Sequence, residues 1–180
     1  MKALSMKELL KDLEKRFGIS KIVHQRSNEV FVTVKKDVAV GMIAHLRDHE
    51  GFKHLVLLTA VDWLEDGKFQ LTYLLNNHEL RSDLGLRVMI DREEASMESI
   101  HHLWEQASTY QRELKEMFGI DFPGSPRLNE PFILEGWHDK PPYRRDFDTK
   151  KYSEETYFPR PGRVTHDPAE YMKKKLYPEE

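Results

Sequence analysis

Residues 110–122, Tyr110-Gln-Arg-Glu-Leu-Lys-Glu-Met-Phe-Gly-Ile-Asp-Phe122, divide the sequence into two parts of different character. Before this stretch the apolar residues recur at helical and strand-like spacings, as in a compact domain. All nine prolines of the chain lie after Phe122. Because proline breaks helices and lacks a backbone N–H, the second part is predicted to be extended. We therefore expect a domain at residues 1–122 and an arm at residues 123–180.

Composition and charge limit the possible functions. The 180-residue chain has a net charge of −3, which does not favour nucleic-acid binding. It has no cysteine, which excludes disulfides, thiolate metal sites and cysteine-ligated iron–sulfur clusters. The N-terminus lacks the apolar core of a signal peptide, and no window approaches the roughly 20 apolar residues of a membrane span. We expect a cytoplasmic or peripheral protein with no cofactor of its own.

Three helices are predicted from spacing and end signals. Ser5 and Glu8 form a capping box before an apolar stripe that ends at Gly18. A second helix is predicted to begin at an Asp37 cap and to stop at Gly51. Helical spacing returns from Ser96 to Phe118.

The strands are predicted mainly as hairpins. Residues 22–25 and 30–34 form a first hairpin, and the continuous apolar run at 54–64 is predicted to be a fully buried strand. A turn at Glu65-Asp-Gly67 leads into a strand at 68–75, and one more strand follows at 84–90. This order predicts an α+β fold with a mixed or antiparallel sheet and helices on one face, followed by a long extended C-terminal arm.

The arm carries many aromatic side chains for an extended segment, among them Trp137, Tyr143 and Phe147. Aromatic and arginine side chains commonly anchor protein interfaces, and the apolar fraction of 39% is lean for a self-contained globule. We expect the arm to become ordered against a partner. The alternative is that it folds back on its own domain.

The candidates for chemistry within the chain are few. His45, His49 and His54 resemble a zinc-protease helix, but Leu46 stands where that motif needs its general-base glutamate. Asp62 ends the apolar strand without a paired acid or nucleophile nearby in sequence. A small metal-dependent enzyme using these residues remains the alternative to a binding protein.

Residues 110–122 are predicted to close the last helix of the domain. One face carries the apolar residues Leu103, Ala107, Tyr110, Leu114 and Met117, with Phe118 at its edge. Arg112 and Glu116 lie four residues apart on another face, at a spacing that allows them to pair. Arg112 and Glu113 are either solvated or desolvated against a partner, where loss of one charge costs about 2–5 kcal/mol.

The same stretch resembles the signature of the 30 kDa (C) subunit of respiratory complex I, Tyr-Glu-Arg-Glu followed by an acidic residue and Phe-Gly-Ile. The resemblance covers about residues 5 to 150 in the family's order. It is carried upstream by Leu57–Trp63 and Ile100–Trp104, and downstream by Gly124–Leu128, Ile133–Trp137 and Pro142–Phe147. Gln111 and Ser125 replace a glutamate and a histidine of the pattern. Such departures are similar to those of membrane-bound energy-converting hydrogenases and archaeal sulfane-sulfur-reducing complexes.

The resemblance implies a scaffold role without catalysis. Family members sit on the cytoplasmic face of the membrane in the peripheral arm of an ion-translocating redox complex. They pack on the D-like, hydrogenase-large-subunit-like subunit near the B-like, iron–sulfur subunit, and their C-terminal segment wraps a neighbour. The residues expected at this contact are Tyr110, Arg112, Glu113, Phe118, Trp137, Tyr143, Arg144, Arg145, Asp146 and Phe147. A free-standing soluble adaptor is a further alternative.

Overall fold

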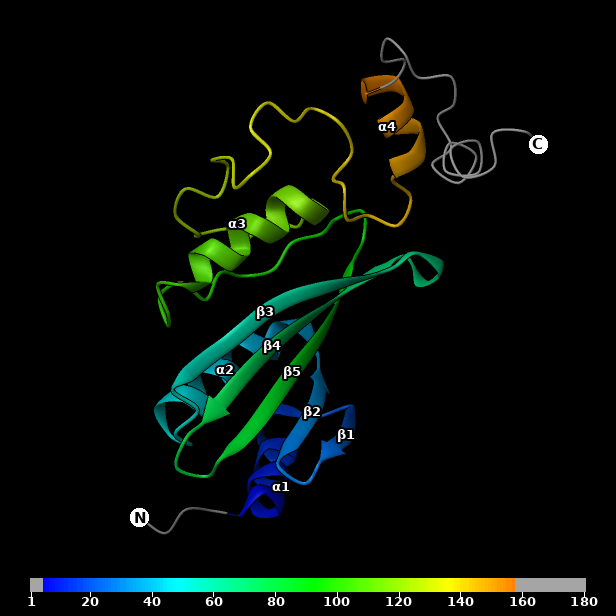
Figure 1. Ribbon diagram of the computed structural model, residues 1–180. Coiled ribbons are helices and arrows are strands. Elements are labelled where there is room, and N and C mark those ends of the chain that lie inside the picture. The colour runs from blue at the N-terminus through cyan, green and yellow to red at the C-terminus, as the bar shows by residue number, and fades with distance from the viewer. Residues whose placement is uncertain (1–4, 158–180) are drawn as a thin grey trace, which may run out of the picture. The chain divides into compact units, whose positions relative to one another are not determined.

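The computed structural model describes residues 5–157, which form two compact units that divide between Arg144 and Arg145 (Figure 1). The elements of the first unit follow the order that the sequence predicts. They are α1 (Met6–Phe17), β1 (Lys21–Arg26), β2 (Glu29–Val34), α2 (Lys36–Asp48), β3 (His54–Trp63), the short 3-10 helix η1 (Leu64–Asp66), β4 (Lys68–Asn77), β5 (Ser82–Asp91) and α3 (Ala107–Phe118). The second unit contains α4 (Thr149–Tyr157).

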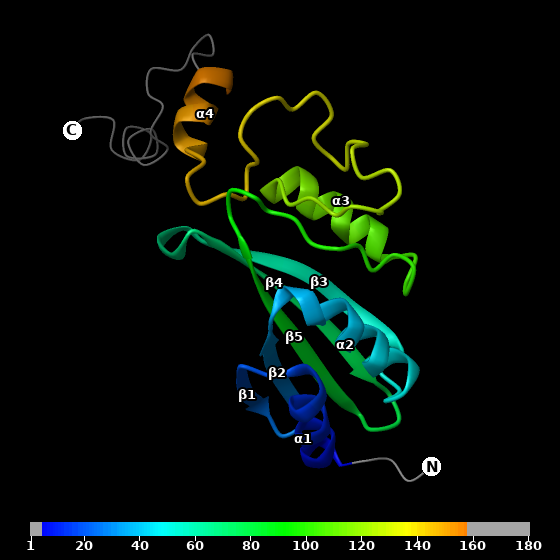
Figure 2. The same cartoon turned by 180° about the vertical axis from the view of Figure 1, so that it is seen from behind.

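The sheet has five strands in the order β1-β2-β5-β4-β3. Only β2 and β5 pair in parallel, and the three other pairs are antiparallel. Figures 1 and 2 show α1 and α2 on the same face of this sheet, while α3 runs beside β3. The prediction of an α+β fold with a mixed sheet is therefore confirmed.

The first helix forms as its sequence predicts. The Ser5 hydroxyl accepts a hydrogen bond from the Glu8 backbone N–H, and the Glu8 carboxylate accepts one from the Ser5 N–H at 2.9 Å. Gly18 ends the helix in the left-handed conformation, with φ of 69°. Leu9, Leu10 and Leu13 are buried against the core.

Within residues 5–157, no helix combines the length and apolar character needed to cross a membrane.

Both predicted ends of the second helix and the predicted start of the third were wrong, whereas the third helix does end at Phe118. Lys35, not Asp37, occupies the N-cap of α2. Asp37 lies in the first turn, where its negative charge interacts favourably with the positive end of the helix dipole. The α2 helix ends at Asp48, with His49 as its C-cap, before Gly51. The α3 helix begins only at Ala107. Residues 96–106 instead run as a bridge and turns, because Met97 N–H bonds Asp121 O at 2.9 Å and the Trp104 side chain bonds the residue before β3.

The prediction of a fully buried strand at residues 54–64 was also wrong. β3 lies at the edge of the sheet, and its burial alternates. Leu55, Leu58, Ala60 and Asp62 point into the core, whereas Leu57, Val61 and Trp63 are 40%, 43% and 42% exposed. The strand is apolar on both faces, as a buried strand is, but one of those faces carries no helix of the first unit.

The region after Phe122 is less uniform than an extended arm. Residues 123–144 belong to the first unit, so the compact domain continues well beyond the boundary expected at Phe122. In the second unit, Asp148 caps α4 by accepting the Lys151 N–H at 2.9 Å. A nine-residue helix fits here because the sequence has no proline between Pro142 and Pro159. The rest of the expected arm, from residue 158 onward, lies outside the described residues.

Candidate interface site

The α3 helix is attached to the outer edge of the sheet at β3 by three side chains. Trp104 Nε1 donates to Lys53 O at 2.8 Å, Tyr110 OH donates to Val56 O at 3.1 Å, and Gln106 Nε2 donates to Leu55 O. These donors satisfy carbonyl groups that an edge strand otherwise leaves without a partner. Tyr110, expected at a partner contact, thus helps to hold α3 on its own sheet.

The buried face of α3 contains one polar side chain that sequence reasoning missed. Gln111 is fully buried, and its Oε1 accepts a hydrogen bond of 2.8 Å from Ser99 Oγ. The bond joins α3 to the preceding segment. Gln111 directly follows Tyr110, which belongs to the predicted apolar face of the helix, but Gln111 itself was not assigned to that face. Its burial would have followed from the helical spacing alone, since it is four residues after Ala107 and three before Leu114.

The outer face of α3 holds the segment that follows it. Glu116 accepts three backbone N–H groups, from Phe132 at 2.7 Å, Ile133 at 2.9 Å and Leu134 at 3.2 Å. Arg112 lies 3.9 Å from the Glu130 carboxylate and 5.6 Å from the centre of the Phe132 ring. The pair that the spacing of Arg112 and Glu116 allows is therefore not formed, because the glutamate bonds the amides of a neighbouring loop.

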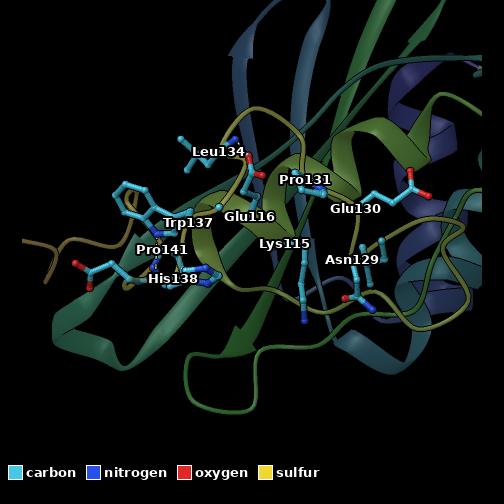
Figure 3. A pocket seen from close by; sticks show the side chains of 12 residues that line it. Lys115, Glu116, Asn129, Glu130, Pro131, Leu134, Trp137, His138 and Pro141 are labelled. Atoms are coloured by element: carbon cyan, nitrogen blue, oxygen red, sulfur yellow. Dashed lines mark hydrogen bonds between the residues drawn. The ribbon is translucent and has the colours of Figure 1, made fainter.

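A cavity of about 350 Å³ lies between α3 and this loop (Figure 3). Lys115 and Glu116 line it from the helix, and Glu130, Trp137 and His138 line it from the loop. Trp137 Nε1 donates to the carbonyls of Asp139 at 2.9 Å and Lys140 at 3.1 Å. The indole is thus fixed at the rim of a hollow that has both apolar and charged walls.

The C-terminal end of α3 is closed by two predicted interface residues. Tyr143 N–H donates to Met117 O at 2.9 Å, and Arg144 Nε donates to Phe118 O at 2.6 Å. The Phe118 ring lies 5.7 Å from the Tyr143 ring and 5.8 Å from the ring of Phe69 in β4. Tyr143 remains 58% exposed, so its outer side is available to a partner.

Seven of the ten expected contact residues therefore lie in the first unit, on α3 or in the segment that packs against it. Glu113 is half-buried on α3. Arg145, Asp146 and Phe147 belong to the second unit, where the Phe147 ring lies 5.6 Å from the Tyr152 ring. Their contact with a partner remains a prediction.

β3 carries an exposed apolar surface that was not predicted from the sequence. Leu57, Val61 and Trp63 of β3 form, with the adjoining Leu64, an exposed apolar surface that we call the β3 patch. Behind Leu57, the strand register places Leu74 of β4 and then Gly85 of β5 on the same face. Large apolar side chains gathered on one open sheet face are typical of a protein contact surface. In the sequence, these residues are part of the apolar run at 54–64, which the structure places in an edge strand.

The candidates for chemistry are separated or already paired. Within residues 5–157, His45, His49 and His54 do not form a cluster of metal ligands. The rings of His45 and His49 lie tilted to each other with their centres 5.0 Å apart, whereas His54 stacks on His78. Asp62 is buried in a two-point ion pair with Arg92, at 2.9 and 3.1 Å. The three histidines of the alternative enzyme interpretation are thus not brought together.

Comparisons with known proteins agree with the fold. The family model described as "Respiratory-chain NADH dehydrogenase, 30 Kd subunit" matches residues 32–153. The chain is 32% identical to the C subunit of NADH-quinone oxidoreductase from Citrifermentans bemidjiense, over 72% of this chain and 80% of that protein. It is 35% identical to the corresponding protein of Rhodobacter capsulatus, over 78% of this chain and 71% of that protein.

Two solved structures share the architecture. A chain in the structure of the membrane-bound sulfane sulfur reductase, an archaeal respiratory membrane complex, superposes with a TM-score of 0.79 and 26% identity. That match covers 89% of this chain and 97% of the other. A trypsin-resistant fragment of Nqo5 shares the fold with a TM-score of 0.59 and 22% identity, over 67% of this chain and 97% of the fragment. The family match, which spans most of the chain, and the two NADH-quinone oxidoreductase relatives show that this protein belongs to the respiratory-chain NADH dehydrogenase 30 kDa subunit family.

Proposed function

We propose that this chain is a non-catalytic scaffold subunit in the peripheral arm of a membrane-bound, ion-translocating redox complex of the complex I type. The observation that carries the proposal is the β3 patch beside a helix whose outer face is already covered by its own chain. The patch exposes Leu57, Val61 and Trp63 where a self-contained domain would present polar side chains. A covering subunit would bury them.

The partners we propose are the D-like, hydrogenase-large-subunit-like subunit and the B-like, iron–sulfur subunit. The protein would attach to the cytoplasmic face of the membrane through them. Support comes from the relatives in NADH-quinone oxidoreductase and from the structural match to a sulfane sulfur reductase complex. A rigid support between cofactor-bearing subunits maintains the distances on which electron transfer depends.

The second proposed contact uses the segment after α3 and the second unit. Trp137 and Tyr143 present aromatic surface beside α3, while Arg145, Asp146 and Phe147 begin the second unit. Residues 145–180 would wrap the neighbouring subunit. The few side chains that dominate an interface, each costing about 2 kcal/mol or more when truncated, are enriched in Trp, Tyr and Arg.

The test is recovery of the complex through an affinity tag on this chain. We expect the D-like and B-like subunits to co-purify from the membrane fraction, and we expect Trp63→Ala or Val61→Glu to reduce their recovery. Gln25→Glu provides the matched control, since it adds a carboxylate to an exposed position of the opposite edge strand, β1. Thermal unfolding of each variant separates lost binding from lost folding.

The second contact needs a truncation that leaves α3 intact. Removing residues 145–180 retains the bonds of Tyr143 and Arg144 to α3, and we expect it to release the partners while the first unit stays folded. Full recovery of both partners from the truncated chain would contradict the wrapping contact. Recovery only in the soluble fraction would favour an adaptor, and turnover by the isolated chain would favour an enzyme.

The type of complex is decided by the reaction of the recovered assembly. NADH-quinone oxidoreductase, ferredoxin-dependent hydrogenase and sulfane sulfur reductase activities differ in their electron acceptor, and the first also differs from the other two in its electron donor. The chain is similar both to C subunits of NADH-quinone oxidoreductase and to a chain of the sulfane sulfur reductase complex, so both reactions are tested on the recovered assembly. Either outcome identifies the complex without affecting the scaffold role.

A further inference from the structure

A group of three potential metal ligands lies where α1 meets the end of α2. Asp12 belongs to α1, His45 to the last turn of α2, and Glu50 to the loop that follows. Each offers one ligand atom, and these atoms all lie within 4.8 Å of one another. The packing of the two helices thus brings Asp12 to residues that lie far from it in sequence.

The imidazole of His45 is the least satisfied member of this group. Its Nε2 atom is buried and has no hydrogen-bond partner among the described residues, although Glu50 Oε1 lies 3.4 Å away. The side chains of His45 and Glu50 are only 14% and 16% exposed. A buried ring nitrogen beside a half-buried carboxylate is unfavourable unless a proton or a metal ion lies between them.

Neighbouring residues restrain the Asp12 carboxylate and the backbone of Glu50. Arg16 Nε lies 2.7 Å from one Asp12 oxygen, which leaves the other oxygen free to act as a ligand. Asn77 Nδ2 donates to the Glu50 backbone carbonyl at 2.8 Å, and Gly51 follows with φ of 77°. Such supporting bonds around the ligands orient them for a metal ion.

The ligand atoms suit one class of metal. One imidazole nitrogen with two carboxylates is a donor set that Zn²⁺ and similar divalent transition metals accept, whereas Mg²⁺ and Ca²⁺ prefer oxygen alone. Bonds of about 2.0–2.2 Å require the ligand atoms to move closer than they are. Asp12, whose side chain is 33% exposed, has the freedom to do so.

We propose that Asp12, His45 and Glu50 form a binding site for a divalent transition-metal ion of the Zn²⁺ class, which fastens α1 to the end of α2. The three ligands are independent of the β3 patch and of α3, so the site does not depend on the scaffold function. The ion would bind the folded chain and raise its melting temperature.

The test uses the full-length chain freed of metal by a chelator. We expect one equivalent of Zn²⁺ to bind and to raise Tm, and Co²⁺ to give the visible absorption of a low-coordinate nitrogen and oxygen site. His45→Gln and Glu50→Gln should each weaken Zn²⁺ binding at least tenfold. His78→Gln is the matched control, because it removes a histidine of the separate His54 and His78 stack and should leave binding unchanged.

Three results would overturn the proposal. One is the absence of any stoichiometric binding of Zn²⁺ or Co²⁺ to the full chain. Another is binding that His78→Gln abolishes and His45→Gln does not, which would place the metal at the other histidine pair. The third is an unchanged melting temperature when Zn²⁺ binds, which would mean that the ion does not fasten α1 to the end of α2.

Discussion

Arg144 Nε donates a 2.6 Å hydrogen bond to the carbonyl oxygen of Phe118, the last residue of α3. Twenty-six residues separate the two partners. The guanidinium also lies 5.3 Å from the centre of the Phe69 ring. A cation at the C-terminal end of a helix interacts favourably with the negative end of the helix dipole. It also donates to a carbonyl group that has no hydrogen-bond partner within the helix. The segment after α3 is therefore part of the domain through its contact with the helix end.

Arg144→Ala should lower the free energy of unfolding of the full chain by about 2 kcal/mol, because a charged donor to a helix carbonyl is lost. Urea denaturation measures the change. Arg145→Ala is the matched control, since the neighbouring arginine is exposed and lies in the second unit. Its effect on unfolding should stay within about 0.5 kcal/mol. Equal losses for the two variants would argue against the capping role of Arg144.

Glu116→Gln should loosen the loop that lines the cavity without unfolding the domain. The carboxylate accepts the N–H groups of Phe132, Ile133 and Leu134, and a neutral amide is a weaker acceptor with only one oxygen. We expect these three amides to exchange with deuterium faster in the variant. Glu113→Gln is the control on the same helix, and unchanged exchange in both would show that the loop is held by other contacts.

Asp62→Ala should be among the most destabilising single changes in the sheet. It leaves Arg92, whose side chain is 12% exposed, without the carboxylate that it contacts at two points. Removing one member of a buried ion pair typically costs about 3–5 kcal/mol. Asp66→Ala, at an exposed position of η1, should change the free energy of unfolding by less than about 0.5 kcal/mol. Similar values for the two variants would contradict a structural role for Asp62.

The parts of the fold that the sequence predicts are those with local signals. The capping box of Ser5 and Glu8 and the hairpin of β1 and β2 need only neighbouring residues, and both are present. The position of β3 could not be predicted in this way. Leu57 and Val61 are as apolar as the residues of a buried strand, and only the sheet order shows that they lie at an edge.

The candidate site shows the same division. Tyr110, Arg112 and Phe118 were placed on one helix by their spacing, and the structure places them there. The bonds that Glu116 and Arg144 make to distant segments had no such signal, because the proline-rich residues 123–144 carry no periodicity that predicts packing. Proline after Phe122 indicates irregular backbone, but irregular backbone can still pack against a helix.

Tyr73 provides a prediction for alkaline pH. Its ring is fully buried in β4, its hydroxyl has no hydrogen-bond partner among the described residues, and burial raises the pKa of the phenol above its ordinary value near 10. The unfolded chain therefore loses this proton at a lower pH than the folded chain. It follows that the folded state is destabilised progressively as the pH rises above about 10, with no contribution from Tyr73 below that pH.

Tyr73→Phe removes both the buried hydroxyl and its titration. We expect the variant to be more stable than the parent chain by about 1 kcal/mol at neutral pH, since an unpaired buried polar group is eliminated. The difference should grow above about pH 10, because only in the parent chain does ionisation of this phenol stabilise the unfolded state. Urea denaturation at neutral and alkaline pH measures both effects, with the exposed Tyr143→Phe as the control. A loss of stability in Tyr73→Phe at neutral pH would instead show that the hydroxyl has a favourable partner, such as a buried water molecule.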